Sequence, residues 1–495
     1  MQRLNTPAEA AQWLRTRVSA NLTVDSRLVR DGDGFIAWPG FATDGRQFVG
    51  AARAQGATAC LVELQGADQF DLQGDDIAGY EGLKAATGLI ASAYFEDPSA
   101  ELDVLAVTGT NGKTSTAWWL AQAISRLRSG APCAVVGTLG VGVPPDVRYN
   151  GLTTPDPVLL QRTFRVCADK SFSACAIEAS SIGIAERRLD GTRIRVAVFT
   201  NFTQDHLDYH ASMDAYWQAK AELFRWPGLA AAVVNVDDVQ GATLAGELGE
   251  PMDLWTFSAV GDARLCAQSI VTTEQGLRFD VVEDGQRHSL QTQLIGQYNV
   301  SNLLGVIGAL RAMDVPLADA VTACTGLLPV PGRMQRVDSV AGQPLAVVDY
   351  AHTPDALDKA LTGLRTLTVE RGGRLWCVFG CGGDRDPVKR PMMGAVAEKC
   401  ADSIVITSDN PRSEKPEAIV SQILLGLTKP EAAQVQVDRA SAIADALKQA
   451  GAQDVVLIAG KGHEAWQEVA GRREEFSDVE HAARALAARS QEGKA

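Results

Sequence analysis

Short apolar runs recur along the chain, and each run ends at polar residues before a stretch of helical character begins. Such runs occupy residues 104–107, 174–177, 196–199, 345–348, 375–379, 404–406 and 455–458. Wholly apolar strands that alternate with helices are typical of parallel sheets covered on both faces. The sequence therefore predicts an α/β protein. Parallel sheets bind ligands at the carboxyl ends of their strands, so we expect the chemistry at the polar residues that follow these runs.

Three blocks follow from shifts in composition and from the positions of the runs. They span residues 1–97, 98–332 and 333–495, and the middle block closes at a Pro-Val-Pro-Gly segment. A length of 495 residues fits about three domains. We expect a smaller N-terminal α/β domain, a central P-loop-type parallel sheet with flanking helices, and a C-terminal Rossmann-like domain. The polar tail from Ser490 is expected to be disordered.

The run at residues 104–107 leads into a turn framed by two glycines and followed by Lys-Thr-Ser. Glycines let backbone N–H groups face a phosphate, the lysine can reach the terminal phosphates, and a hydroxyl can hold magnesium. Val107 stands where the eight-residue P-loop pattern has its first glycine, so this is a shortened form. The alternative is an ordinary strand, turn and helix with a surface lysine. The residues expected to bind ATP are Gly109, Thr110, Asn111, Gly112, Lys113, Thr114 and Ser115.

Composition excludes some classes of function. The chain has 46 basic and 60 acidic residues and a net charge of -14, the wrong sign for wrapping nucleic acid. No apolar run is long enough to span a bilayer and the N-terminus lacks the apolar core of a signal peptide, so we expect a cytoplasmic protein without membrane insertion. The nine cysteines lack metal-ligand spacing and are expected to be buried free thiols.

Three side chains of the middle block are candidates for a metal site. Glu178 and His206 each follow a predicted strand, where a carboxylate and a neutral imidazole can surround magnesium. The alternative is a helix-capping glutamate and a surface histidine. Lys220 lies in a helical stretch, and composition alone favours a solvated lysine. If it were desolvated, its amine could react with carbon dioxide and become an anionic metal ligand.

Other polar residues near the predicted block boundary can complete a nucleotide site. Asn299 and Asn302 lie about one helical turn apart, where a side-chain amide could read the adenine edge or, alternatively, cap a helix. Arg333 follows the Pro-Gly pair and could meet a phosphate, and Asp349 at a strand end could take a ribose hydroxyl.

The last block carries charges suited to an amino acid. Arg412, in Asp-Asn-Pro-Arg, and Arg385 follow neighbouring apolar runs and could bind one carboxylate through paired hydrogen bonds. Glu464 supplies the opposite charge for an ammonium group. Each alone could be an ordinary surface residue. Together, at the ends of parallel strands, they predict an amino-acid pocket.

The motifs closely resemble those of the Mur ligases, the ATP-dependent amino-acid-adding enzymes of peptidoglycan synthesis. The segments that carry the resemblance start at Asp25 (Asp-Ser-Arg), Asp44 (Asp-Gly-Arg), Gly109, Thr153 (Thr-Thr), Glu178 (Glu-Ala-Ser-Ser), Thr200 (Thr-Asn-Phe-Thr-Gln-Asp-His), Lys220, Pro331 (Pro-Gly-Arg), Asp349 (Asp-Tyr-Ala-His-Thr-Pro) and Asp409 (Asp-Asn-Pro-Arg). They span nearly the whole chain, and the last resembles the signature of members that add meso-diaminopimelate.

The resemblance implies that UDP-MurNAc-L-Ala-D-Glu and meso-diaminopimelate are joined through an acyl phosphate with ATP and Mg2+. We expect the protein to be a monomer. It implies that Val24, Ser26, Phe41, Ala42 and Thr43 hold the uridine nucleotide, and that Thr153, Thr154, Ser180, Glu186 and Arg188 contact the muramoyl dipeptide. It implies that Thr114, Glu178, His206 and a carboxylated Lys220 surround the metal, and that Arg385, Asp409, Asn410, Pro411, Arg412, Gly460 and Glu464 grip diaminopimelate. Two positions depart from the family: Glu186 replaces the usual glutamine and Ile182 a histidine.

Two kinds of alternative stay open. The first is another ligase of the superfamily, either a lysine-adding relative, against which Arg412 argues, or a folylpolyglutamate synthetase, against which the N-terminal block argues. The second is a protein that binds ATP for regulation without forming an amide. Phosphate release that depends on an amino acid separates an enzyme from a binding protein.

Overall fold

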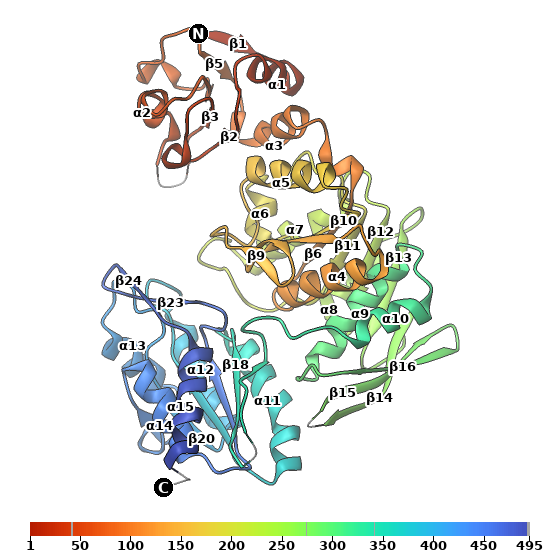
Figure 1. Ribbon diagram of the computed structural model, residues 1–495, viewed down its shortest axis with the longest axis vertical. Helices are drawn as coiled ribbons and strands as arrows, with labels where there is room; N and C mark the ends of the chain where they lie inside the picture. Colours follow the sequence, from red (N-terminus) through yellow and green to blue (C-terminus); the bar gives the residue numbers. More distant parts are fainter. Residues whose placement is uncertain (41–42, 274, 341, 493–495) are drawn as a thin grey trace.

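The computed structural model describes residues 1–40, 43–273, 275–340 and 342–492, so Phe41 and Ala42 lie outside the described residues. The chain folds into three α/β units, each built on its own sheet, that follow one another along the molecule (Figure 1). The middle unit lies between the other two. This arrangement confirms the predicted fold class.

The N-terminal sheet is parallel throughout, with the strand order β1-β5-β4-β3-β2. Its strands are short, and its inner strands β3, β4 and β5 are wholly buried. The elements of this unit are β1 (Gln2–Leu4), α1 (Pro7–Arg15), β2 (Leu22–Thr23), β3 (Gly34–Ala37), α2 (Val49–Ala54), β4 (Ala59–Glu63), β5 (Ile77–Tyr80) and α3 (Leu83–Tyr94).

The middle sheet has the order β16-β15-β14-β13-β12-β11-β6-β10-β7-β8-β9. Its centre is parallel, but β14, β15 and β16 form an antiparallel extension at one edge and β7, β8 and β9 at the other. Buried and less buried residues alternate along much of β15, because one face is partly solvated. The predicted central parallel sheet is therefore present, and the antiparallel edges are an addition that the sequence analysis did not predict. The elements are β6 (Asp103–Thr108), α4 (Lys113–Leu127), β7 (Cys133–Gly137), β8 (Gly140–Val143), β9 (Asp146–Arg148), α5 (Pro157–Asp169), β10 (Ala174–Glu178), α6 (Ser181–Ala185), β11 (Val196–Phe199), α7 (Met213–Ala221), β12 (Ala231–Asn235), α8 (Val239–Glu247), β13 (Asp253–Ser258), β14 (Leu265–Thr273), β15 (Gly276–Glu283), β16 (Gln286–Thr292), α9 (Tyr298–Arg311) and α10 (Leu317–Thr325).

The C-terminal sheet has the order β17-β18-β22-β19-β20-β21, and only β17 among these described strands is antiparallel to its neighbour. Its last helix continues to Glu492, so the prediction of disorder was wrong for residues 490–492, where Gln343 Nε2 donates to the Ser490 hydroxyl at 2.7 Å. Residues 493–495 of the predicted tail lie outside the described residues. The elements are β17 (Gln335–Arg336), β18 (Leu345–Asp349), α11 (Pro354–Arg371), β19 (Leu375–Phe379), α12 (Lys389–Cys400), β20 (Ser403–Ile406), α13 (Pro416–Leu424), β21 (Gln434–Val435), α14 (Arg439–Gln449), β22 (Val455–Ala459), β23 (Trp466–Val469), β24 (Arg472–Glu475) and α15 (Asp478–Glu492).

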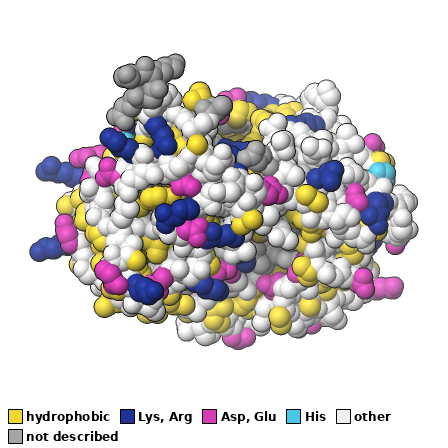
Figure 2. All heavy atoms as spheres, turned by 90° about the horizontal axis from the view of Figure 1, so that it is seen from below, with side chains coloured by type: hydrophobic (Ala, Val, Ile, Leu, Met, Phe, Trp, Pro, Cys, Tyr) yellow, Lys and Arg dark blue, Asp and Glu magenta, His cyan; other side chains and the backbone are white. Residues whose placement is uncertain are grey.

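Helices cover both faces of the middle and C-terminal sheets. In the middle unit α4, α9 and α10 contribute to one apolar core, and the strand residues of opposite parity face a second. This two-sided burial is why the strands read as unbroken apolar runs. No helix in the described part of the chain has the length and apolar character needed to cross a membrane. On the face seen in Figure 2, acidic and basic side chains are interspersed.

Candidate functional site

The glycine-framed loop joins β6 to α4 at the carboxyl end of the middle sheet. Gly109 and Gly112 have φ values of 145° and 84°, a region that side chains rarely adopt. A Cβ at Gly109 would overlap the Thr200 hydroxyl, and one at Gly112 would overlap the Asn302 side-chain oxygen. The loop therefore needs glycine at both positions, and the backbone can approach a phosphate closely.

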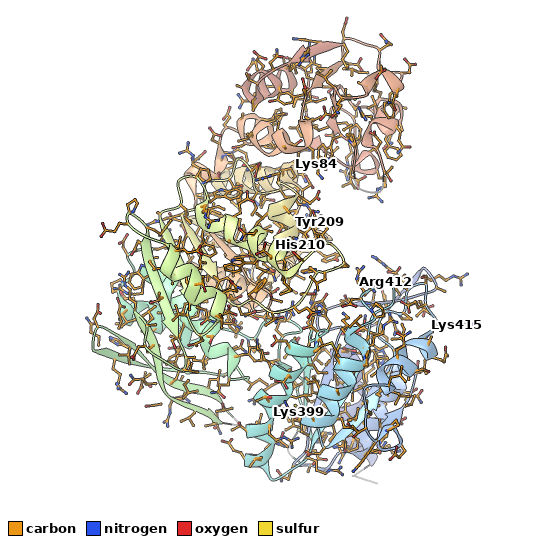
Figure 3. The ribbon with its side chains drawn as sticks, turned by 180° about the vertical axis from the view of Figure 1, so that it is seen from behind. Lys84, Tyr209, His210, Lys399, Arg412 and Lys415 are labelled. Carbon is orange, nitrogen blue, oxygen red and sulfur yellow. The ribbon has the colours of Figure 1, made fainter. Side chains whose placement is uncertain are left out.

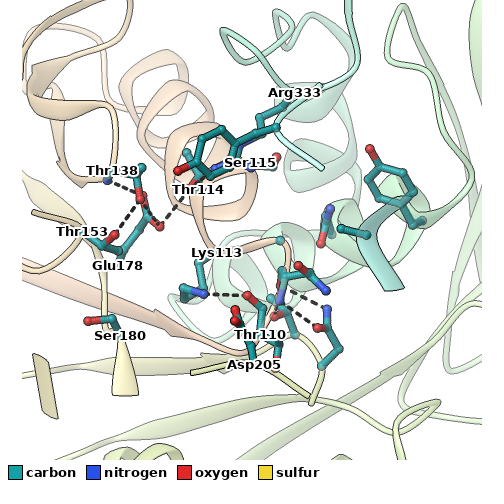
Figure 4. Close-up of a pocket in the computed structure, with 18 of the residues that line it drawn as sticks. Thr110, Lys113, Thr114, Ser115, Thr138, Thr153, Glu178, Ser180, Asp205 and Arg333 are labelled. Carbon is teal, nitrogen blue, oxygen red and sulfur yellow. Dashed lines mark hydrogen bonds between the residues drawn. The ribbon is translucent and has the colours of Figure 1, made fainter. Parts of the chain in front are cut away.

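Lys113 is the first residue of α4 and lies at the floor of this loop (Figure 4). Its Nζ donates hydrogen bonds to the carbonyl oxygens of Gly109 at 2.9 Å and Thr110 at 2.8 Å. Burial lowers the pKa of Lys113, although the Glu178 carboxylate opposes this shift. The amine is thus fixed at the N-terminus of α4, where its positive charge and the helix dipole would together stabilise a bound polyphosphate.

Glu178 ends β10 beside the start of α4, with a buried side chain. Its Oε2 accepts the Thr114 hydroxyl at 2.9 Å, and its Oε1 accepts the Thr138 backbone N–H at 2.7 Å (Figure 4). A carboxylate and a hydroxyl are hard oxygen donors of the kind that Mg2+ prefers. No group of three or more His, Cys, Asp or Glu side chains within the described ranges could hold a metal by itself. The donors fit a magnesium that takes its other ligands from phosphate and water.

His206 follows β11 with a left-handed φ of 52°. Its Nε2 lies 3.5 Å from Asp205 Oδ2, and burial lowers the pKa of the imidazole, which favours the neutral, metal-binding form. Sequence reasoning did not single out Asp205, which also lines the cavity beside Lys113. Its place in the polar segment that follows β11, directly before His206, was the available signal.

Lys220, on α7, is only 1% exposed, so the interpretation as a solvated helix lysine was wrong. Its Nζ donates to the Gly109 carbonyl at 2.7 Å and lies 4.4 Å from the centre of the Tyr216 ring. Lys113 donates to the same carbonyl oxygen. Burial, together with the Lys113 charge, lowers the pKa of Lys220 well below its ordinary value. A neutral amine is the form that reacts with carbon dioxide.

A cavity of about 550 Å³ opens in front of the loop, between the middle and C-terminal units. Arg333 reaches across it: its Nη2 lies 3.3 Å from the Thr114 hydroxyl, and its guanidinium stacks 4.4 Å from the centre of the Tyr350 ring.

Asn302 also lies at this cavity. Its side chain does not cap the start of α9, because its amide donates to Asn299 Oδ1 at 2.9 Å. Asp349 accepts the Met334 and Ala351 N–H groups and, being buried, has a raised pKa. The predicted residues that line the cavity are Thr110, Asn111, Gly112, Lys113, Thr114, Ser115, Thr153, Thr154, Ser180, Glu178, Arg188, His206, Asn302, Arg333 and Asp349.

The residues predicted to contact the dipeptide form one hydrogen-bonded edge of this cavity. The hydroxyls of Thr154 and Ser180 lie 2.9 Å apart, and Arg188 Nη1 donates to the Thr154 carbonyl at 2.9 Å. Glu186 is arranged differently. It accepts the Lys84 ammonium at 2.6 Å and the Tyr209 hydroxyl at 2.5 Å, so it joins the N-terminal and middle units on the side seen in Figure 3. Ile182, the second departure, lines the cavity.

The candidate amino-acid residues gather at the carboxyl ends of β19, β20 and β22, outside the cavity lining. Arg412 and Arg385 both lie within 4 Å of the position that a Cβ on Gly382 would take. Glu464 Oε2 accepts the Asn410 amide at 2.7 Å and the buried Lys461 ammonium at 2.9 Å. Sequence reasoning missed Lys461, although it lies only three residues before Glu464 in the chain. Asp409 and Gly460 are neighbours, since a Cβ at Gly460 would lie 2.5 Å from Asp409 Oδ2, and the Pro411 carbonyl packs against Gly383.

The structure describes three of the candidate uridine residues, Val24, Ser26 and Thr43, which lie in the N-terminal unit and do not line the cavity. Ser26 begins a short 3-10 helix capped by the Asp25 carboxylate, and Val24 packs against the N-terminal core. The Thr43 carbonyl accepts the Gly40 N–H at 2.9 Å.

Comparisons with known proteins cover nearly the whole chain. Three models match: "Mur ligase family, catalytic domain" over residues 19–115, "Mur ligase middle domain" over 107–310, and "Mur ligase, glutamate ligase domain" over 332–462. A UDP-N-acetylmuramoyl-L-alanyl-D-glutamate--2,6-diaminopimelate ligase of Acidovorax sp. (strain JS42) is 62% identical over 98% of both chains. One of the same name from Janthinobacterium sp. (strain Marseille) is 48% identical, again over 98% of both. A solved structure with that name is 34% identical, with a TM-score of 0.66 over 95% of each chain. The chain therefore belongs to the Mur ligase family.

Proposed function

We propose that this Mur ligase uses ATP to add meso-diaminopimelate to the D-glutamate of UDP-MurNAc-L-Ala-D-Glu. The observation that carries the proposal is the cavity in which the glycine loop and Lys113 face Arg333 from the next unit. The names of the relatives at 62% and 48% identity supply the substrates. We take the domains as residues 1–97, 98–332 and 333–495, binding the UDP-sugar, ATP and the amino acid respectively.

The reaction runs in two steps. A D-glutamate carboxylate oxygen attacks the γ-phosphorus of ATP, the bond to the β,γ-bridging oxygen breaks, and an acyl phosphate and ADP form. The amine of diaminopimelate then attacks the acyl carbon, phosphate leaves, the amine loses a proton, and the amide remains. Lys113 and Arg333 stabilise the phosphoryl charge, while Asn302 and Asp349 hold the adenosine.

Thr114, Glu178, His206 and Lys220 would hold magnesium, which when bound neutralises phosphate charge. Lys220 fits this set as a carbamate. Its amine shares the Gly109 carbonyl with that of Lys113, so an anion on Lys220 would replace repulsion between two amines by attraction. The hydroxyl edge of Thr153, Thr154, Ser180 and Arg188 would orient the dipeptide, with Glu186 beside it. Because all these groups come from one chain, we propose that the enzyme works as a monomer. We also propose that it works in the cytoplasm.

Specificity follows from Arg412 and Arg385. Diaminopimelate carries a second carboxylate that lysine lacks. When lysine binds, the guanidinium that would pair with this carboxylate is left without a partner. The test is phosphate release by the full chain with ATP, Mg2+ and the UDP-dipeptide. We expect release that depends on diaminopimelate, and lysine to be at least about 100-fold less efficient. Release that is independent of any amino acid, or equal efficiency with lysine, would contradict the proposal.

A further inference from the structure

Arg439 is a buried arginine outside the site described above. It is the first residue of α14 and is 1% exposed. A positive charge at a helix N-terminus opposes the helix dipole, so propensity gives no reason for an arginine there. Its Nε and Nη2 donate to the two carboxylate oxygens of Asp478, at 2.8 and 2.7 Å. Asp478 begins α15, and neither side chain is exposed.

The rest of the Arg439 guanidinium holds two strand ends. Its Nη1 donates to the Ser408 carbonyl at 3.1 Å, and its Nη2 donates to the Ala459 carbonyl at 2.9 Å. Ser408 follows β20 and Ala459 ends β22, and β19 lies between these strands in the sheet. One planar group therefore fixes the spacing of two strand ends that do not pair with each other.

Each of these carbonyls immediately precedes a segment of the candidate amino-acid pocket. Ser408 is followed by Asp409–Arg412, and Ala459 is followed by Gly460–Glu464. The two segments meet: Asn410 donates to Glu464 Oε2 at 2.7 Å, and a Cβ at Gly460 would lie 2.5 Å from Asp409 Oδ2. A shift of either strand end would separate the arginine that would take a carboxylate from the glutamate that would take an ammonium.

We propose that Arg439 and Asp478 are a positioning pair that sets the geometry of the amino-acid pocket from behind; this rests on the proposed function of that pocket. A buried ion pair adds little net stability compared with apolar packing, because both charges lose their hydration. The four hydrogen bonds of Arg439 have fixed directions, so they hold the loops that follow Ser408 and Ala459 at a fixed spacing. Through Asp478, the C-terminal helix α15 takes part in substrate binding without touching substrate.

The test compares Arg439→Lys and Asp478→Asn with Asp454→Asn. Lysine keeps the charge of Arg439 but lacks the planar fork, and asparagine keeps the shape of Asp478. Asp454 is the matched control: it precedes β22 at the amino end of that strand, opposite to Ala459, and there it accepts the Trp376 indole N–H at 2.9 Å and the Arg374 N–H at 2.8 Å. The measurements are steady-state KM values for diaminopimelate and ATP, melting temperature, and hydrogen exchange of the Asn410, Arg412 and Gly460 amides.

We expect Arg439→Lys and Asp478→Asn to raise the KM for diaminopimelate at least about tenfold, as for loss of a charge-assisted hydrogen bond, with the KM for ATP unchanged. Exchange of the three amides should accelerate in both variants. Asp454→Asn should lower the melting temperature and move neither the KM nor this exchange. If the two variants only melt earlier, as the control does, the positioning role is overturned. If the wild-type chain shows no diaminopimelate-dependent phosphate release, the proposed function fails, and the exchange data still decide the role of Arg439.

Discussion

The two contacts of the middle unit differ in kind. Toward the N-terminal unit it shares an apolar core, in which Val158 of α5 clusters with Leu14, Leu83 and Ile90. The backbones also touch, because a Cβ at Gly88 of α3 would overlap the Asp190 carbonyl. Toward the C-terminal unit lies the cavity, crossed by polar bonds such as that from the Asn111 amide to Asp355 at 2.9 Å.

This difference teaches which contact can move. Apolar packing with close backbone contact resists displacement, whereas a polar, cavity-containing contact can change without large loss of buried area. The candidate amino-acid residues lie outside the cavity that holds Lys113. Arg412 lies on the C-terminal unit, separate from Tyr209 and Lys84 (Figure 3). We therefore expect closure of the C-terminal unit to bring the amine to the acyl phosphate while the N-terminal unit stays in place.

The largest effect should come from removing the charge at the C-terminal contact. Lys113→Ala should reduce phosphate release by at least about 1000-fold, because the phosphoryl charge loses a fixed partner. Lys170→Ala, at an exposed lysine just after α5, is the control and should leave turnover unchanged. Turnover near the wild-type rate in Lys113→Ala would show that the phosphate site is misassigned.

Lys220 should carry a carbamate that depends on dissolved carbon dioxide. Its lowered pKa leaves more neutral amine near neutral pH, and acid reverses the reaction by protonating that amine. Removing carbon dioxide at about pH 6 should lower activity several-fold, and bicarbonate should restore it, as for loss of one metal ligand. Protein treated with 13C-bicarbonate should show a carbamate signal that is missing in Lys220→Met. Full activity without carbon dioxide, together with no such signal, would contradict the carbamate.

The N-terminal contact can be broken without touching the site. Gly88→Ala places a methyl group against the Asp190 carbonyl and should lower the free energy of unfolding by about 1–3 kcal/mol. Gly50→Ala is the matched control, since Gly50 lies in helix α2 with nothing within 4 Å of its Cβ position. That variant should be neutral or more stable by up to about 1 kcal/mol. If urea denaturation gave the same change in the free energy of unfolding for both variants, the backbones at the Gly88 contact could move apart at little cost, which would contradict this prediction.

The smallest effect should come from the Glu186 contact. Its pair with Lys84 is partly exposed, with side chains 42% and 25% exposed, so Glu186→Gln should cost at most about 1 kcal/mol. A double-mutant cycle with Lys84→Met measures the coupling directly. We expect a measurable coupling and a KM for the UDP-dipeptide within about threefold of wild type, a change below 1 kcal/mol. A tenfold rise in that KM with no coupling would assign Glu186 to substrate contact instead.

The parallel strands could be predicted well from the sequence. Strands that are buried on both faces consist of unbroken apolar runs, such as residues 174–177 and 455–458. It did not predict the antiparallel edges of the middle sheet, whose alternating pattern is weak and partly solvated. The glycine loop was predictable because its positive φ angles require glycine at positions 109 and 112, close in the chain to Lys113.

The surroundings of single side chains were harder to predict. Lys220 reads as a solvated helix residue, yet it is buried under a loop more than 100 residues away in the chain, at Gly109. Arg439 and Asp478 likewise meet only in the folded protein, 39 residues apart. Local pattern cannot encode such contacts, because the partner lies on a different element.

The central claim is that the site is completed by movement at one contact only, and distances between spin labels test it most directly. Labels at Val239 and Leu425, 81% and 80% exposed, span the middle and C-terminal units, and labels at Val239 and Leu28, which is 65% exposed, span the middle and N-terminal units. Cys266 and Cys400, both partly exposed, would be replaced by serine. With a non-hydrolysable ATP analogue, Mg2+ and the UDP-dipeptide, the Val239–Leu425 distance should shorten and the Val239–Leu28 distance should stay unchanged. A constant Val239–Leu425 distance, or a larger change in the Val239–Leu28 pair, would contradict the account.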